Sequence, residues 1–543
     1  MRSTLFLLIA LLISLSPAKA QPQISVSDPF EEPEGGYNKV LQVRNGNTFH
    51  FHITKASISY TIYDKAHKAI VKKEIDGKEL AAEKIGSATI NGIHDINGEA
   101  VIFFTQMEGR APNLYRLRFN PETGALVEDK SIATIAKYKG GSGWAMAYGD
   151  VQPSKFHIEV DPVSNAYGVL AFHGFAEDSK ERLKLYHYSA DHKPLSEQNY
   201  GNPGNFKFIN YIAMTVDDKK AIVAAYGFNT KAAGGKDSRV IISRLRAGET
   251  DFSHELLDYT DDFKETGGVM RYNSVSNKIQ LLTCTYMRST SKFLRNKGIN
   301  YYMVLMSVID PETLQPLHVK PLEYKMVSKY MSDHFKVAKP FSGFPQNMIV
   351  NTNGSTSVCV EETVTETITS SRGSVTYRTY LDNIGIVDLD TTAEEINGMG
   401  IMKSQYVMTL IGAFDQAEAR KGTWQFYPFG MMYRNQHFFS FDYINTEKGR
   451  YVLFNDYPEN QARYGTRKPE TVKDVSSTNT IGYTLGKDKK TYYIFGKPAD
   501  DRESTFFYLQ SSDFKKSTGI YATLIVERKG RKKESRIAWL SFE

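Results

Sequence analysis

The chain has 543 residues, of which 41% are hydrophobic and 24% are charged. These shares are close to the globular average and exclude a disordered, collagen-like or polytopic membrane chain. Its two cysteines exclude a disulfide scaffold, an all-cysteine zinc site and an iron–sulfur cluster. With 33 Tyr, 31 Phe and 3 Trp, the composition favours half-buried strands and therefore an all-β fold.

Residues 1–20 are predicted to form a cleaved secretory signal peptide. Arg2 supplies a positive charge, an apolar run extends from Leu5 to Leu15, and Ala18-Lys19-Ala20 ends the segment. The run is shorter than the roughly 20 residues of a membrane anchor, and no later stretch is apolar enough to span a bilayer. We expect cleavage after Ala20 and a mature chain, 21–543, that is secreted or periplasmic, or held at the cell surface through another molecule.

The charge of the chain is nearly balanced for its size. The formal net charge of +6 falls to +4 when Arg2 and Lys19 leave with the signal peptide. Such a balance gives no support for nucleic-acid binding, and we predict no nucleic-acid partner.

One turn recurs along the chain. Asn120-Pro121-Glu122-Thr123 and Asp310-Pro311-Glu312-Thr313 each follow an alternating strand. Asx before Pro predicts a type I turn, because the Asx side chain accepts backbone N–H bonds while Pro fixes φ. With looser copies of the hairpin, turns fall at positions 64, 120, 191, 248 and 310, at intervals of 56, 71, 57 and 62 residues. A period near 60 residues is typical of a four-stranded unit.

Two further strand candidates precede each hairpin, for example Val40–Arg44 and Phe49–Ile53 around Asn45-Gly46-Asn47. Repeated four-stranded antiparallel sheets indicate a β-propeller. The chain resembles secreted bacterial β-propeller proteins of unassigned function in its turn chemistry, although it contains no Gly-His/Trp-Asp pairs, sialidase-type Asp box or kelch double glycine. The alternative is two stacked sandwiches of about 250 residues each, which would need no such period.

The two ends of the chain are predicted to close the ring. Seven hairpins are visible, and the last strand candidate, 535–543, has no successor to cover its unpaired edge. Gln23–Asp28 can supply the missing outer strand, so we favour eight blades over seven. Longer intervals after Asp310 predict insertions near 324–343 and 402–425. Apolar residues at helical spacing in 327–338 and 404–420 predict that at least one of them contains a short helix.

No catalytic or metal-binding motif stands out. His50 and His52 share a strand face, but no third zinc ligand lies nearby in the sequence. Gly140-Gly-Ser142-Gly-Trp144 has neither the spacing nor the context of a nucleophile elbow. HExxH, P-loop and dinucleotide fingerprints are missing. We therefore predict no cofactor and no metal, and leave enzymatic activity uncertain and disfavoured.

The two cysteines, Cys284 and Cys359, fall in the second strands of consecutive units. Period-2 alternation points them to opposite faces of their own sheets, so adjacent blades can present them to each other as a disulfide. Bridged Cα atoms lie about 4.4 to 6.8 Å apart, however, which is less than the usual 10 Å or so between packed sheets. Two buried free thiols are therefore favoured over the disulfide.

Four residues are candidates for ligand binding. Arg271 and Arg434 occupy matching places in two similar first strands, and first strands line the axis of a propeller. They are expected to face the central channel or its mouth, where they can bind an anion, a carboxylate or a peptide, although salt bridges within the repeat are the commoner role. Trp144 and Trp424 offer flat apolar faces to a glycan or a protein.

The sequence thus predicts an exported all-β propeller that acts as a binding or scaffolding module for another envelope protein or a surface glycan. The alternative is a glycan-active hydrolase or lyase with an axial active site, which depends on fold analogy alone. Three or more carboxylates, histidines or arginines converging in one axial pocket would favour the enzyme.

Overall fold

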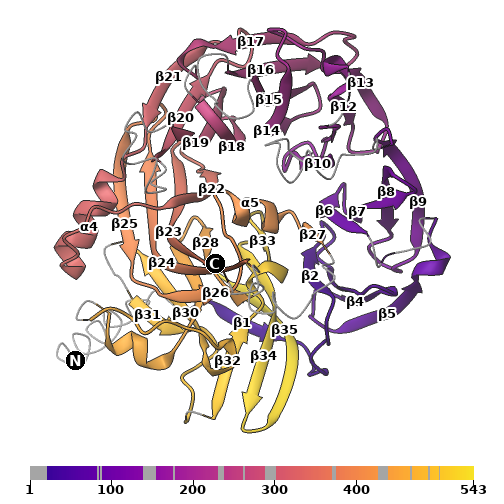
Figure 1. The fold of residues 1–543 in the computed structure, drawn as a ribbon. Helices are drawn as coiled ribbons and strands as arrows, with labels where there is room; N and C mark the ends of the chain where they lie inside the picture. The colour runs from indigo at the N-terminus through magenta and orange to yellow at the C-terminus, as the bar shows by residue number, and fades with distance from the viewer. Residues whose placement is uncertain are drawn as a thin grey trace, which may run out of the picture.

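The computed structural model describes residues 21–542 apart from 82–84, 86–87, 138–153, 175, 177, 230–237, 261–262, 288–300, 370–374, 426–437, 465–466, 487–489 and 501. Over these ranges the strands form eight antiparallel sheets, which are the blades of a β-propeller (Figure 1). The colours in Figure 1 run once round the ring, so the blades follow one another in chain order. The predicted fold class is confirmed, with eight blades.

The first strands of neighbouring blades contact one another around the axis, and the last strands lie at the rim. Blade 1 contains β2 (Tyr37–Gln42), β3 (Thr48–Ile53), β4 (Ser57–Tyr63) and β5 (Ala69–Asp76), and blade 2 contains β6 (Thr89–Ile96), β7 (Glu99–Glu108), β8 (Ala111–Phe119) and β9 (Leu126–Thr134). Blade 3 contains β10 (Lys155–Val160), β11 (Tyr167–Phe172), β12 (Leu183–Tyr188) and β13 (Pro194–Asn199), and blade 4 contains β14 (Phe208–Val216), β15 (Lys220–Phe228), β16 (Arg239–Arg246) and β17 (Ser253–Leu257). Blade 5 contains β18 (Phe263–Asn273), β19 (Lys278–Met287), β20 (Tyr301–Ile309) and β21 (Pro316–Pro321). Blade 6 contains β22 (Phe344–Val350), β23 (Thr356–Thr369), β24 (Val375–Leu389) and β25 (Glu395–Ile401), with β26 (Gln405–Val407) beside β24. Blade 7 contains β28 (Asp442–Asn445), β29 (Arg450–Asp456), β30 (Asn479–Leu485) and β31 (Lys490–Tyr493).

Blade 8 is built from both ends of the chain. Its strands are β32 (Glu503–Phe507), β33 (Asp513–Lys515), β34 (Ile520–Lys529), β35 (Lys532–Ser541) and β1 (Gln23–Val26). β1 pairs with β35 from Gln23 opposite Ser541 to Val26 opposite Ala538. Indigo β1 accordingly lies beside yellow β35 in Figure 1. The predicted closure of the ring by the terminal strands is confirmed.

The hydrophobic core consists of layers between adjacent blades. Between blades 1 and 2, Phe51 and Tyr60 meet the ring of Phe119 edge-on, with ring centroids 5.5 and 5.3 Å apart. Alternation places every second residue of a strand in such a layer. Aromatic residues bury large areas there, which accounts for the high Tyr and Phe content.

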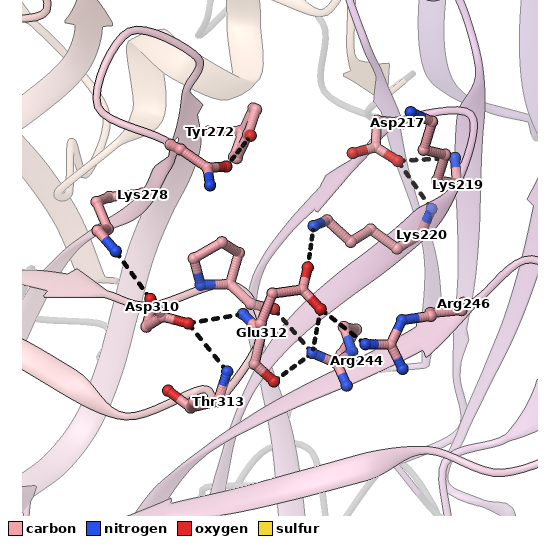
Figure 2. A network of polar contacts seen from close by, with 12 residues as sticks. Asp217, Lys219, Lys220, Arg244, Arg246, Tyr272, Lys278, Asp310, Glu312 and Thr313 are labelled. Carbon is pink, nitrogen blue, oxygen red and sulfur yellow. Dashed lines mark hydrogen bonds and ion pairs between the residues drawn. The ribbon is translucent and has the colours of Figure 1, made fainter.

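The Asx-Pro-Glu-Thr turn of blade 5 forms as predicted. The carboxylate of Asp310 accepts the backbone N–H groups of Glu312 (2.9 Å) and Thr313 (3.0 Å), and its other oxygen accepts a bond from Lys278 Nζ at 2.8 Å (Figure 2). The side chain thus fixes the turn in the way that Asx residues do.

This turn also fastens blade 5 to blade 4. In Figure 2 the Glu312 carboxylate points across the blade boundary, where it lies 2.9 Å from Lys220 Nζ and 2.7 Å from Arg246 Nη2. Arg244 Nη1 of blade 4 donates to the carbonyl oxygen of Pro311 at 3.0 Å. The corresponding turn of blade 2 is held in the same way, because Asn47 Nδ2 of blade 1 donates to the Pro121 carbonyl at 2.9 Å.

The insertion after blade 5 contains α4 (Lys325–Phe335), which packs on β25. Gly398 permits this packing, because a Cβ there would stand 2.5 Å from the backbone nitrogen of Val327. The insertion after blade 6 contains α5 (Asp415–Arg420). The helical structure predicted from the spacing of apolar residues in 404–420 forms only in part, since Gln405–Val407 is strand β26. Tyr406 N donates to the Val472 carbonyl at 3.0 Å, so this segment is held extended by backbone pairing.

Cys284 and Cys359 are both free and buried, so no disulfide forms. They lie in β19 and β23, the second strands of blades 5 and 6, as predicted. Cys284 packs in the layer between blades 5 and 6, whereas Cys359 packs between blades 6 and 7. Alternation turns Cys359 away from blade 5 and keeps the thiols in different layers. In the described ranges, no helix has the length and apolar character needed to cross a membrane.

Candidate functional site

The segment 412–425, which we call the plug, crosses the propeller axis. It leaves blade 6, where Phe414 N donates to the Pro345 carbonyl at 2.7 Å, and continues through α5. It ends on blade 2, where Ile93 N donates to the Lys421 carbonyl at 2.9 Å and β27 (Trp424–Gln425) pairs with β6. Figure 1 shows α5 inside the ring, between β22 and β27.

Beside the plug lies an axial pocket of about 180 Å³. First strands of four blades and the plug contribute its polar side chains. These are His94 of β6, Glu159 of β10, Arg271 of β18, Asn347 of β22, and Arg420 and Lys421 of the plug.

Glu159 joins two cations in this pocket. Its carboxylate lies 3.0 Å from Arg271 Nη1 and 2.8 Å from Lys421 Nζ. Lys421 also lies 3.0 Å from Glu418 of the plug. Burial alone would lower the pKa of Lys421, but the Glu159 and Glu418 carboxylates outweigh it and raise that pKa. Lys421 is therefore a permanent cation that ties the plug to blade 3.

Arg420 ties the plug to blades 7 and 8. Its Nη2 lies 2.5 Å from the carboxylate of Asp442, and its Nη1 donates to the Leu509 carbonyl at 2.8 Å. Burial raises the pKa of Asp442, although the Arg420 guanidinium opposes this. The guanidinium is thus occupied on one side and borders the pocket on the other.

The guanidinium group of Arg271 uses only part of its hydrogen-bonding capacity. Its Nη1 is bonded to Glu159 and to the Met270 carbonyl, both at 3.0 Å. Within the part of the chain that the structure describes, its Nε and Nη2 have no hydrogen-bond partner, and the side chain remains 29% exposed. Two N–H donors of a rigid fork are therefore available at the pocket.

His94 is a neutral imidazole at the pocket. Burial, followed by the charges of Lys421 and Lys39, lowers its pKa to about 3. Its Nε2 atom is buried and has no hydrogen-bond partner among the described residues. The ring lies directly over Gly92, since a Cβ at that position would stand 2.3 Å from Nε2. Gly92 is therefore needed for this orientation of the ring.

The charged side chains that line the pocket are mainly basic. Arg271, Arg420 and Lys421 line the pocket together with one carboxylate and one neutral imidazole. Asp442 and Glu418, which are not part of the lining, pair with Arg420 and Lys421. No group of three or more His, Cys, Asp or Glu among the described residues is arranged to hold a metal ion.

Of the two sequence-predicted binding residues that the structure describes, one lies in this pocket. Arg271 lines it, whereas Trp424 stacks on Tyr37, with centroids 5.2 Å apart and an interplanar angle of 8°, and packs against the core of blades 1 and 2. Trp144 and Arg434 lie outside the described residues. The binding roles of all four remain predictions.

Sequence reasoning missed His94, Glu159 and Lys421. Arg271 was chosen because it lies in the first strand of a blade. His94 of β6 and Glu159 of β10 also lie in first strands, so the same criterion would have identified them. No comparable signal marks Lys421, because its place depends on the path of the plug across the axis.

Comparisons with known proteins find no matching family model and no matching curated protein. Among solved structures, the chain is similar to the polysaccharide lyase Uly1, with a TM-score of 0.37 and 12% identity over 83% of this chain and 90% of that one. For prolyl oligopeptidase B from Galerina marginata the TM-score is 0.36, with 8% identity over 94% of this chain and 56% of that one. For a GH43 endo-arabinanase from Bacillus licheniformis the TM-score is 0.25, with 12% identity over 53% and 99%. Likeness at this level carries no argument about activity.

Proposed function

We propose that the protein is a binding module whose axial pocket holds the carboxylate of an acidic sugar in an envelope glycan. The observation that carries the proposal is the pair of unoccupied guanidinium donors, Nε and Nη2 of Arg271, at a pocket that also contains Lys421 and Arg420. Arginine recognises carboxylates through two parallel N–H bonds.

The size and lining of the pocket support a small polar ligand. Its volume of about 180 Å³ is below the 300 to 1,000 Å³ or so of pockets for drug-sized, largely apolar ligands. Room for one acidic sugar unit is therefore expected, with the rest of the glycan outside. Asn347 and Glu159 can bond the hydroxyl groups that accompany the carboxylate.

Calorimetric titration with glucuronate tests the proposal, and glucose serves as the uncharged control ligand. Arg271→Gln removes the free fork and should weaken glucuronate binding by about tenfold or more, because a charged hydrogen bond contributes about 1.5–3 kcal/mol. Arg502→Gln is the matched control, since Arg502 is 80% exposed in blade 8 and loses the same charge. Equal binding of glucose and glucuronate, or equal effects of the two substitutions, would contradict the proposal.

A glycan-active enzyme is the second candidate. The pocket meets the criterion set for it from the sequence, since His94, Glu159, Arg271 and Arg420 converge there. His94 is the observation that gives this candidate a mechanism. Its Nε2 atom has no hydrogen-bond partner among the described residues and is the atom that would accept a proton, while Lys421 and Arg271 lie in the same pocket to hold a carboxylate. In a lyase it would take the proton from the carbon next to the carboxylate while the bond to the departing sugar oxygen breaks and a double bond forms, and the departing oxygen would take a proton from water. Incubation with polygalacturonate would show the ultraviolet absorbance of unsaturated ends, and His94→Ala would abolish it. A glycosidase is less well supported, because Glu159 is the single carboxylate among the described residues that line the pocket.

The predicted export is part of the proposal, since it brings the pocket to envelope glycans. N-terminal sequencing of the protein recovered from the envelope fraction should begin at Gln21.

A further inference from the structure

A second cavity, which we call the blade 5–6 cleft, is lined by none of the residues of the axial pocket. Its volume is about 730 Å³, and it is lined by β19 and β20 of blade 5, by β22, β23 and β24 of blade 6, and by residues 337–343. This volume falls within the range of about 300 to 1,000 Å³ that is typical of ligand sites.

One wall of the cleft is aromatic. The rings of Tyr302 and Phe344 lie side by side, with centroids 4.6 Å apart and an interplanar angle of 31°. The Tyr302 hydroxyl is fixed by a 3.2 Å hydrogen bond with Ser342 Oγ. Both rings are half-buried, and both line the cleft. Flat, rigid aromatic faces suit the C–H faces of sugar rings.

The cleft also contains two oriented carboxylates. Glu362 of β23 accepts bonds from Asn383 Nδ2 at 2.7 Å and from Ser342 N at 3.3 Å. Asp382 of β24 accepts a bond from Ser404 Oγ at 2.9 Å. A carboxylate has about four acceptor sites, so both groups have lone pairs left for hydroxyl donors.

The charges of the cleft are balanced. Lys339 and Lys468 line it together with Glu362 and Asp382, and Lys468 Nζ lies 3.8 Å from Asp382. The two lysines would repel a cationic ligand, and the two carboxylates would repel an anionic ligand. The ligand that suits the aromatic rings and the balanced charges is uncharged, has apolar faces and is rich in hydroxyl groups.

We propose that the blade 5–6 cleft binds a neutral oligosaccharide. Its sugar rings lie against Tyr302 and Phe344, and its hydroxyl groups donate to Glu362 and Asp382. The proposal adds a second site to the protein and does not depend on the axial pocket.

An array of cello-, xylo-, manno- and galacto-oligosaccharides, followed by calorimetry on the best binder, tests the cleft. Glu362→Gln keeps the volume of the side chain but places an amide where both carboxylate oxygens accept. It should weaken binding by about tenfold, as expected for a lost hydrogen bond to a charged group. Tyr302→Ala should weaken it further. Tyr377→Ala, at a 41% exposed tyrosine outside the cleft lining, should leave binding unchanged.

The axial variant Arg271→Gln separates this proposal from the proposed function. It should leave oligosaccharide binding unchanged, and Glu362→Gln should leave glucuronate binding unchanged. Absence of binding to every oligosaccharide, or binding that Glu362→Gln and Tyr302→Ala do not affect, would overturn the cleft proposal. Thermal unfolding of each variant checks that the fold is retained, and Glu362→Gln remains decisive if Tyr302→Ala does not fold.

Discussion

The ammonium group of Lys403 lies 2.6 Å from the carboxylate of Glu361, and both side chains are fully buried at the end of blade 6. Lys403 also donates to the Leu381 carbonyl at 2.9 Å and to Gln405 Oε1 at 3.0 Å. Ser440 Oγ donates to Glu361 at 2.5 Å. The ion pair therefore joins the insertion after blade 6 to the core of that blade.

Lys403→Met should destabilise the protein by about 3–5 kcal/mol, because it leaves the Glu361 charge buried and without its partner. The double variant Lys403→Met/Glu361→Leu should recover much of this loss, since replacing both members of a buried pair with apolar residues is often neutral. Urea unfolding of the wild type, both single variants and the double variant gives the coupling energy. Additive losses would show that the pair is not coupled.

Ser25→Pro should open the ring where the terminal strands meet. Ser27 N donates to the Ile537 carbonyl at 2.9 Å, so the alternation of the antiparallel ladder directs the N–H of Ser25 toward Trp539 and that of Val26 outward. Proline at position 25 removes a ladder donor and should cost about 1–3 kcal/mol. Val26→Pro is the matched control with a smaller loss. Equal falls in the melting temperature of the two variants would contradict the pairing.

Strand alternation and turn chemistry were sufficient to predict the blades from the sequence. The Asx-Pro-Glu-Thr turns at Asn120 and Asp310 form within a few residues, so the local sequence is enough to predict them. The closing strand at residues 23–28 pairs with the other end of the chain, and it was predicted because the last strand candidate lacked a neighbour. The strand at Gln405–Val407 was missed because its pairing with Val472 is a long-range contact that competes with helical spacing.

The axial pocket was only partly predictable for the same reason. Arg271 was assigned to the axis from its place in a first strand, and the structure places it there. Glu159 is one of 61 acidic residues, and its role depends on Lys421, which reaches it only because the plug crosses the ring. The favoured prediction of two buried free thiols agrees with the structure. The disulfide stayed open as an alternative because alternation alone does not specify which neighbouring blade each strand face meets.

Asp310→Asn should flatten the dependence of stability on pH. The Lys278 ammonium, followed by the backbone N–H of Thr313, holds the pKa of Asp310 well below its ordinary value. A depressed folded-state pKa stabilises the protein above the unfolded pKa of about 3.9, and this stabilisation is lost as the pH falls through that value toward the folded pKa. Asparagine keeps the oxygen that caps the turn, as Asn120 does in blade 2, but carries no charge.

Urea unfolding at a series of pH values measures this effect. The wild type should lose more stability than Asp310→Asn as the pH falls from about 6 to about 3. Asp218→Asn makes the same chemical change at an exposed hairpin residue and should retain the slope of the wild type. Parallel curves for wild type and Asp310→Asn would show that the ion pair with Lys278 contributes nothing.

The two thiols should resist alkylation in the folded protein. Burial raises the pKa of Cys284 to about 12 and also raises that of Cys359. The reactive thiolate is therefore scarce, and both sulfur atoms are shielded between blades. Iodoacetamide should label neither cysteine in native buffer, and it should label both in urea without a reductant. Intact-mass spectrometry gives the number of labelled cysteines. Labelling of Cys284 alone in native buffer would show that the layer between blades 5 and 6 opens locally. No labelling in urea would show that the two cysteines form a disulfide, which would contradict their placement in separate layers.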